Sequence, residues 1–116
     1  MDKLITDYIE LATNHVELLF DGDSKKANKI HKKLMDIVLK IRKDKSLHGL
    51  YFDLLENKII TVRMWTAVEF SNTFEEKALR KLIEIEKLDS ILSLTAYSLI
   101  DSIKKGMIKK VNWIDE

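Results

Sequence analysis

The stretch LLENKIITVRMWTAVEF, residues 54–70, is the longest mainly apolar run of the chain, and it carries an arginine, Arg63, in its middle. The apolar side chains around this arginine are Ile59, Ile60, Val62, Met64, Trp65, Ala67 and Val68. A helix that is apolar almost all round is typical of one covered by neighbours on several sides. The run therefore predicts a central helix over about 59–70, whose permanent cation has to be satisfied at the edge of the core.

Length and composition restrict the fold class. The 116 residues are enough for one domain over 1–116 and too few to expect two. There is no proline, only three glycines, and no long segment that alternates in polarity as a half-buried strand would. We therefore expect an all-α fold. The lack of cysteine excludes disulfides, thiol chemistry and cysteine-ligated zinc, and no motif predicts a cofactor.

Apolar residues that recur with a 3.6-residue period predict six helices. Their expected ranges are 3–20, 24–43, 47–56, 59–70, 72–86 and 89–105. The break between the first two helices is so short that they should form an antiparallel hairpin. Leu50 in the third helix and Leu94 in the sixth are expected among the buried residues.

The ends of three helices have their own local signals. Ser46 is the expected N-cap of the third helix, and Ser71 or Asn72 is expected to start the fifth. Gly106 should end the sixth helix in the left-handed conformation that glycine adopts without a steric penalty.

Two parts of the chain repeat one arrangement. Residues 47–70 and 72–105 each contain a helix, a short turn and a second, more apolar helix. Together with the opening hairpin they make three helix pairs, and pairs of this size that stack on one another form an α-solenoid. A plain helical bundle is the alternative. A shift of 29 residues aligns Val62 with Ile91, Ala67 with Ala96, and Phe70 with Leu99.

The central stretch resembles the signature of a HEAT repeat, in which a helix ends in paired leucines and the next helix opens with Val-Arg. The matching residues are Leu54, Leu55, Asn57, Val62, Arg63, Thr66 and Ala67. The whole chain is similar to a small family of bacterial single-domain proteins of unknown function with a HEAT-like α-α superhelix. The second unit departs from the signature, because Leu92 replaces the arginine.

This resemblance implies a short right-handed solenoid of about three antiparallel helix pairs. It also implies a structural role for Arg63. A structural role is expected for Trp65 too, because it is one of the two largest aromatic residues of the chain. The stem of Arg63 would lie between stacked helices, and its guanidinium would bond carbonyls or the carboxylate of Asp53 or Glu56. Trp65 would pack in the core between helix pairs.

Charge is distributed unevenly along the chain. Residues 25–45 contain nine basic and two acidic residues, a net charge of +7, whereas the remainder has eleven basic and seventeen acidic residues, a net charge of −6. Helical spacing places a set of lysines along one outward side of the second helix. We call this set the lysine face; it consists of Lys25, Lys29, Lys32, Lys33, Lys40 and Lys43.

The lysine face has three interpretations. It is a solvated side of an amphipathic helix, a binding surface for an acidic protein, or a binding surface for nucleic acid. Nucleic acid is the weaker of the two binding interpretations, because lysine outnumbers arginine and no aromatic residue lies among the lysines.

Two histidines and one tryptophan leave alternatives open. In a hairpin folded near residue 23, His15 and His31 face each other as a polar pair, and a shared metal would need a third ligand that no spacing motif supplies. Trp113 either covers the last hydrophobic face or forms an exposed anchor.

No nucleophile, acid–base pair or phosphate loop with a recognisable spacing is present, so we do not expect an enzyme. The chain also contains no run of about 18 apolar residues, which excludes a membrane span and favours the cytoplasm. The sequence thus predicts a non-catalytic HEAT-like module that binds a protein with an acidic surface, for example as an immunity or antitoxin partner. The lysine face and the exposed sides of helices four and six would contact it. A nucleic-acid-binding HEAT-like module is the alternative.

Overall fold

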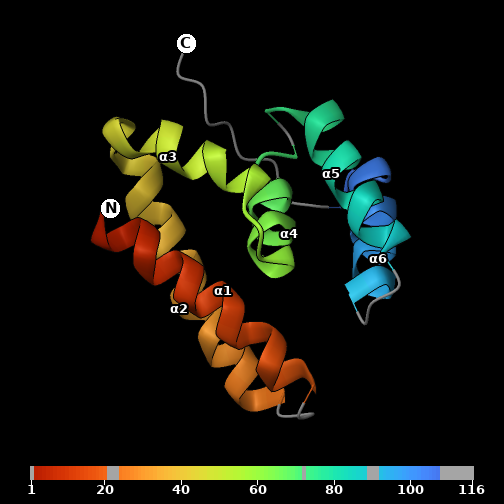
Figure 1. Ribbon diagram of the computed structural model, residues 1–116, viewed down its shortest axis with the longest axis horizontal. Helices are drawn as coiled ribbons and strands as arrows, with labels where there is room; N and C mark the ends of the chain where they lie inside the picture. Colours follow the sequence, from red (N-terminus) through yellow and green to blue (C-terminus); the bar gives the residue numbers. More distant parts are fainter. Residues whose placement is uncertain (1, 21–23, 72, 89–91, 108–116) are drawn as a thin grey trace. The chain divides into compact units, whose positions relative to one another are not determined.

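The computed structural model of the chain describes residues 2–20, 24–71, 73–88 and 92–107, except for the side chains of 15–20, 24 and 27 (Figure 1). Within these residues all regular secondary structure is helical and there is no strand, which confirms the predicted all-α class. The elements are α1 (Lys3–Phe20), α2 (Ser24–Lys43), the 3-10 helix η1 (Lys45–Leu47), α3 (His48–Asp53), the 3-10 helix η2 (Leu54–Glu56), α4 (Ile60–Glu69), α5 (Glu75–Lys87) and α6 (Leu92–Lys104).

The chain divides into two units, Met1–Leu54 and Leu55–Glu116. The first contains α1, α2, η1 and α3, and the second contains α4, α5 and α6. The boundary falls between α3 and α4, two helices that the sequence groups into one pair.

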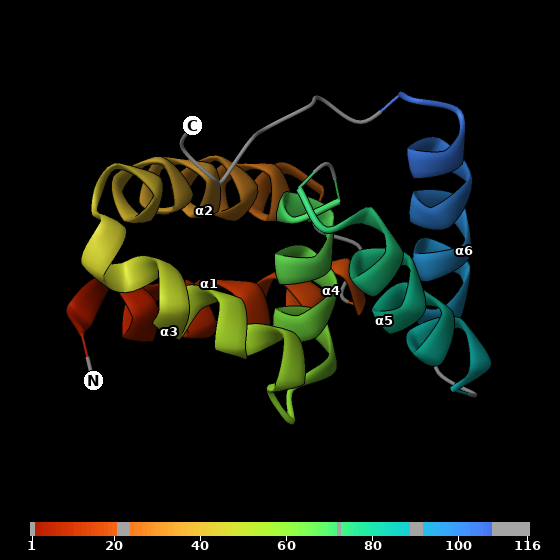
Figure 2. The same ribbon diagram turned by 90° about the horizontal axis from the view of Figure 1, so that it is seen from above.

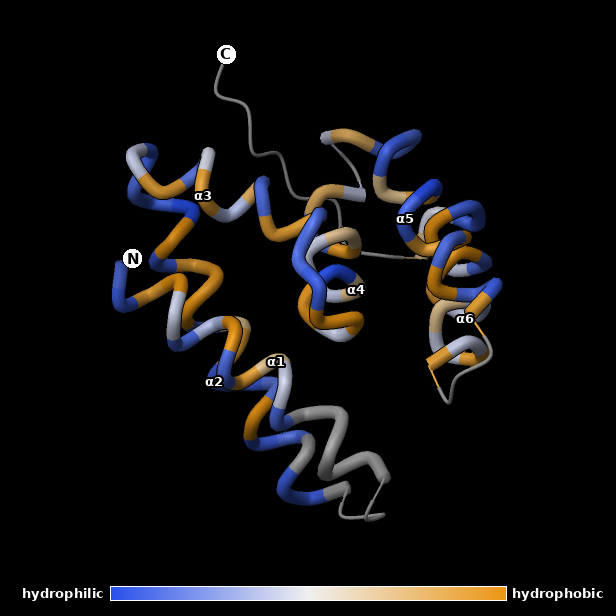
Figure 3. The backbone as a smooth tube through the Cα atoms, viewed as in Figure 1, coloured by the Kyte–Doolittle hydropathy of each residue, from blue (hydrophilic) through white to orange (hydrophobic). Residues whose placement is uncertain are grey.

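In the first unit α1 and α2 run side by side in opposite directions, as the hairpin prediction requires (Figures 1 and 2). Figure 3 shows hydrophobic and hydrophilic positions alternating along the described parts of both helices. The start of α1 is capped by Asp2, whose Oδ1 accepts a 2.8 Å hydrogen bond from the amide of Leu4. The buried residues of this pair repeat every three or four positions: Ile5, Tyr8 and Ala12 in α1, and Leu34, Val38 and Ile41 in α2.

The turn from α2 into α3 is held by polar side chains. Asp44, rather than the expected Ser46, is the capping residue: it is the N-cap of η1, with an extended backbone and an Oδ1 that accepts from the amide of Ser46 at 3.1 Å. The Ser46 hydroxyl donates to the same oxygen at 2.6 Å. The N-cap position of α3 itself is Leu47, which makes no side-chain capping bond. His48 Nε2 donates a 2.8 Å hydrogen bond to the carbonyl of Arg42, which satisfies one of the open carbonyls at the end of α2.

The predicted third helix is not continuous, because 3-10 turns precede and follow the six residues of α3. A 3-10 turn has three residues per turn, so the 3.6-residue phase expected over 47–56 does not carry through this segment. Tyr51 and Leu47 are buried as expected, whereas Leu50 is 45% exposed. The prediction that Leu50 is buried was therefore wrong.

In the second unit α4 contacts α5 and α6, and α5 packs along α6 (Figures 1 and 2). No residue from Ile59 to Ser71 is exposed, which confirms the prediction of a helix covered on several sides. The fully buried Thr66 satisfies its hydroxyl inside the helix by donating to the carbonyl of Val62 at 2.8 Å.

Helix α5 begins at Glu75, later than the predicted start at Ser71 or Asn72. The reason is local, because the chain after α4 continues with backbone hydrogen bonds from Ser71 to Val68 and from Phe74 to Phe70. Phe74 occupies the N-cap position without a side-chain bond, and Glu75 and Glu76 supply the negative charge that favours a helix start.

Helix α6 ends as the sequence predicts. Gly106 has a φ of 70°, and its amide bonds the carbonyl of Ile103 at 3.0 Å, while the amide of Met107 bonds Ser102 at 2.9 Å. These two bonds form the Schellman motif, which requires the left-handed residue.

The expectation of a buried Leu94 in α6 was wrong, because the side chain is 79% exposed. The buried positions Leu92, Ala96 and Ile100 recur at intervals of four residues. A residue two positions from Leu92 lies on the opposite side of the helix. Among the described helices none combines the length and the apolar character needed to cross a membrane.

Candidate functional site

The lysine face of α2 carries six cations that have no partner among the described residues. All six lysines are exposed, and none forms an ion pair within the described residues. They lie opposite the buried Leu34, Val38 and Ile41, so the packing of α2 against α1 directs them to solvent. At about 100° per residue, the six occupy roughly a quarter to a third of the helix circumference.

Several cations of the second unit do have partners. Lys81 is paired with Glu56, Arg80 with Glu76, and Lys105 with Asp101. The pairs of Arg80 and Lys105 join residues four positions apart on one helix. No described residue pairs with the lysine face in this way, so the face concentrates positive potential on one side of α2.

One carboxylate interrupts this surface. Asp36 is exposed and lies four residues after Lys32 and four before Lys40, yet it forms no ion pair with a described residue. It reduces the net charge of the face and separates its two ends.

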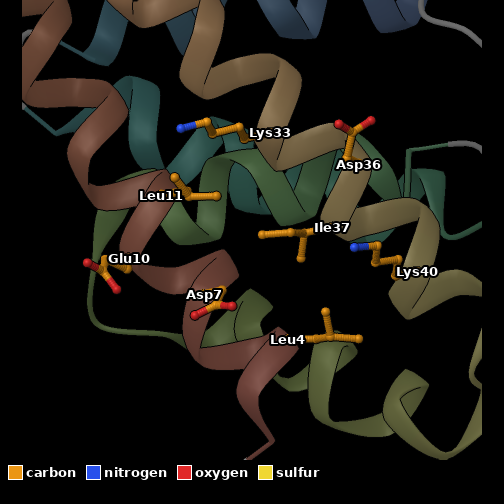
Figure 4. Close-up of a pocket in the computed structure, with 8 residues that line it drawn as sticks. All are labelled: Leu4, Asp7, Glu10, Leu11, Lys33, Asp36, Ile37 and Lys40. Carbon is orange, nitrogen blue, oxygen red and sulfur yellow. The ribbon is translucent and has the colours of Figure 1, made fainter.

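A groove of about 450 Å³ lies between α1 and α2 (Figure 4). Its aliphatic floor comes from Leu4 and Leu11 of α1 and Ile37 of α2, all half-buried. Leu11 and Ile37 point toward each other across the groove in Figure 4. The remaining lining residues are charged: Asp7 and Glu10 from α1, and Lys33, Asp36 and Lys40 from α2.

The two walls of the groove carry opposite charge at the level next to the floor. At about 100° per residue, Asp7 lies nearer than Glu10 to Leu4 and Leu11 around α1, and Lys33 and Lys40 lie nearer than Asp36 to Ile37 around α2. None of the three forms an ion pair with another described residue, so no ion pair among the described residues bridges the two walls. An open apolar floor between uncompensated charges is suited to a ligand that brings its own charges to both walls.

Arg63 is half-buried on α4, and its surroundings differ from the expectation. Its guanidinium forms no hydrogen bond or ion pair with a described residue. Glu56 is bound instead by Lys81, whose Nζ lies 2.7 Å from Oε1 and 2.8 Å from Oε2. The hydrogen bond from Lys81 lowers the pKa of Glu56 against a smaller effect of desolvation, and the charges of Lys81, Lys77 and Arg63 add to the lowering. Arg63 thus acts on Glu56 through its charge at longer range.

Trp65 is half-buried on the same helix, with its indole nitrogen shielded from solvent. Helix α4 as a whole offers no exposed residue, so the expected contact of a partner with an exposed side of helix four has no surface there. Helix α6 does have an exposed side, which includes Leu94 and Tyr97.

The sequence also singled out His15 and His31 as a polar pair and Trp113 as a cover or an anchor. His31 is half-buried on α2, whereas the His15 side chain lies outside the described residues, as does Trp113. Within the described part of the chain, no three His, Asp or Glu side chains gather in a way that could hold a metal ion.

Sequence reasoning found the lysines and allowed a small-ligand pocket between the first two helices around His15 and His31, but it did not identify the residues that line this groove. Leu4, Leu11 and Ile37 belong to the apolar repeat that predicts the two helices, and this repeat does not distinguish a half-buried position from a core one. The available signal was Asp7, an acid placed between the apolar positions of α1.

The chain matches no protein-family model, no curated protein and no solved structure.

Proposed function

We propose that the protein is a non-catalytic binding module whose partner is a protein with an acidic surface, and that the lysine face of α2 makes this contact. The observation that carries the proposal is six exposed lysines on one helix without a single ion pair among the described residues. Such a surface gains electrostatic energy from an acidic partner and accelerates its association. Protein is favoured over nucleic acid because α2 contains no Phe, Tyr or Trp to stack on bases.

The HEAT-like superhelix and the role of an immunity or antitoxin partner in the cytoplasm belong to the same proposal. The superhelix is supported by the packing inside each unit, where α1 pairs with α2 and α5 pairs with α6. A crystal structure in which the helix pairs form successive layers of one right-handed superhelix would support it, and a simple bundle would contradict it.

The binding proposal is tested by reversing charge on the lysine face. The variant Lys29→Glu/Lys32→Glu/Lys43→Glu changes three exposed lysines of α2 that do not line the groove. The matched control, Lys58→Glu/Lys87→Glu/Lys104→Glu, changes three exposed lysines of the second unit that also have no ion pair among the described residues. Circular dichroism should confirm that both variants keep the helical content of the parent.

Tagged parent, variant and control are used to capture partners from the native host, after which the captured protein is purified and titrated directly. The parent and the control should bind it alike, and the lysine-face variant should bind at least about tenfold more weakly, equivalent to about 1.4 kcal/mol. Affinity should fall as salt rises. Equal retention by the lysine-face variant would overturn the proposal, and a preference for a DNA or RNA oligonucleotide over any protein would assign the face to nucleic acid.

A further inference from the structure

The floor of the groove has the dimensions of a helix contact. Leu4 and Leu11 are seven residues apart on α1, which is two turns, or roughly 10 Å along the axis. Ile37 faces them from α2 (Figure 4). A partner helix with apolar residues at i, i+3 or i+4, and i+7 presents a stripe of the same length.

The exposure of the lining residues favours a macromolecular ligand over a small molecule. Every one of the eight is half-buried or exposed, so a small ligand in the groove would keep much of its surface in water. A helix that lies lengthwise on the groove covers the aliphatic floor along both walls.

The charges of the walls specify the sides of that helix. A cation beside its apolar stripe would face Asp7 on α1, with Glu10 farther out. An anion on the opposite side would face Lys33 and Lys40 on α2, where Asp36 also lines the groove but lies farther from the floor. A helix with the same charge on both sides would place like charges against one wall, which costs binding energy.

We propose that the groove between α1 and α2 binds an amphipathic helix of the partner, with its apolar stripe on Leu4, Leu11 and Ile37, its basic side toward α1 and its acidic side toward α2. The inference rests on the proposed function in one respect, because the acidic side of the bound helix would continue onto the lysine face. It goes beyond that function by specifying the secondary structure and the charge pattern of the partner.

Three synthetic peptides of equal length serve as probes, each with the same leucine stripe on a helix. One carries lysine on one side of the stripe and glutamate on the other, the second carries lysine on both sides, and the third glutamate on both. Fluorescence anisotropy with the full-length protein should give a Kd for the two-sided peptide at least fivefold lower than for either uniform peptide. Equal or tighter binding of a uniform peptide, or no binding of any peptide, would overturn the inference.

Two variants test the groove itself. Leu11→Asp places a charge on the half-buried floor and should weaken the two-sided peptide at least tenfold. Asp7→Lys/Glu10→Lys reverses the charge of the acidic wall, so the peptide with glutamate on both sides should become the tightest binder of the three. Loss of folding would not produce this change. Asp53→Lys/Glu75→Lys is the matched control, since it has the same charge change at exposed positions that do not line the groove, and it should keep the parent's preference. An unchanged preference in the Asp7 and Glu10 variant would overturn the inference.

The outcomes separate this inference from the proposed function. If the native partner is lost on reversal of Lys29, Lys32 and Lys43 but no peptide binds, the function stands and the helix-binding groove falls. If the peptides bind with the expected preference while that variant retains the partner, the groove stands and the function falls. The parent could also dimerise in sedimentation experiments, and Leu11→Asp could abolish the dimer. That result would assign the groove to a second copy of the chain and would also overturn the inference.

Discussion

The hydroxyl of Tyr51 in α3 donates a 3.1 Å hydrogen bond to the hydroxyl of Tyr8 in α1, and the two rings meet edge to face with centroids 4.9 Å apart and planes at 79°. Both side chains are fully buried. Tyr8 lies one turn from Leu4 and from Leu11, so a contact that fixes the rotation of α1 about its axis also fixes the floor of the groove. The tyrosine pair therefore connects the core of the first unit to its candidate binding surface.

Tyr51→Phe should lower the free energy of unfolding by about 1 kcal/mol, because it removes this hydrogen bond and leaves the ring packing in place. Tyr51→Ala should cost about 3–5 kcal/mol, because it also removes a fully buried ring. Urea denaturation measures both values. In a double-mutant cycle, Tyr8→Phe and Tyr51→Phe should be less than additive, and strict additivity would contradict a direct bond between the hydroxyls.

Lys81→Met should raise the pKa of Glu56 toward the ordinary glutamate value, because the hydrogen bond from Lys81 is the main cause of its lowering. A carboxyl whose pKa is lower in the folded than in the unfolded protein contributes stability above its unfolded pKa, and this contribution is lost as the pH falls through the folded pKa. The stability difference between parent and variant should therefore be present at neutral pH and smaller at a pH below the ordinary glutamate pKa.

Carbon-detected NMR of the glutamate side chains measures that titration, and denaturation at the two pH values measures the stability difference. Lys87→Met is the control, since Lys87 is exposed and has no ion pair within the described residues. A Glu56 titration that does not move in Lys81→Met would show that the contact with Lys81 does not form in solution.

Arg63→Ala should lower the melting temperature, with a loss of about 1 kcal/mol, because its half-buried stem and its charge near Glu56 are both removed. Arg63→Lys keeps the charge and most of the stem, so it should retain most of the stability. A thermal melt of Arg63→Ala that coincides with the parent's would count against the structural role of this residue.

The two described glycines whose surroundings are open should respond oppositely to the same substitution. An added Cβ meets no atom within 4 Å at either Gly49 or Gly106, so steric space does not distinguish them. Gly106→Ala should destabilise the protein by about 1–2 kcal/mol, because its φ of 70° is costly for an L side chain. Gly49→Ala, inside α3, should stabilise by about 0.5–1 kcal/mol by reducing the freedom of the unfolded chain. Chemical denaturation of both variants measures the contrast, and a shift of the same sign would contradict it.

Local signals accounted for much of the fold. The expected ranges of the first two helices agree with α1 and α2, and the glycine expected to end the sixth helix is left-handed. The start of α5 was placed too early because Ser71 looks like a cap in sequence, whereas its amide in the structure bonds the carbonyl of Val68. Leu50 and Leu94 were assigned to the core because an apolar side chain on a helix does not reveal whether a neighbouring helix covers it.

What the sequence by itself determined is the helical class, the extent of the opening helix pair and the set of lysines on one side of α2. These properties depend on the 3.6-residue period and on residues close together in the chain. Only the tertiary structure decided that Lys81 rather than Arg63 binds Glu56, that Tyr8 meets Tyr51, and that Asp7 lines the same groove as Lys33 and Lys40. These relationships join residues distant in sequence, and they depend on which sides of the helices meet when the chain buries its apolar surface.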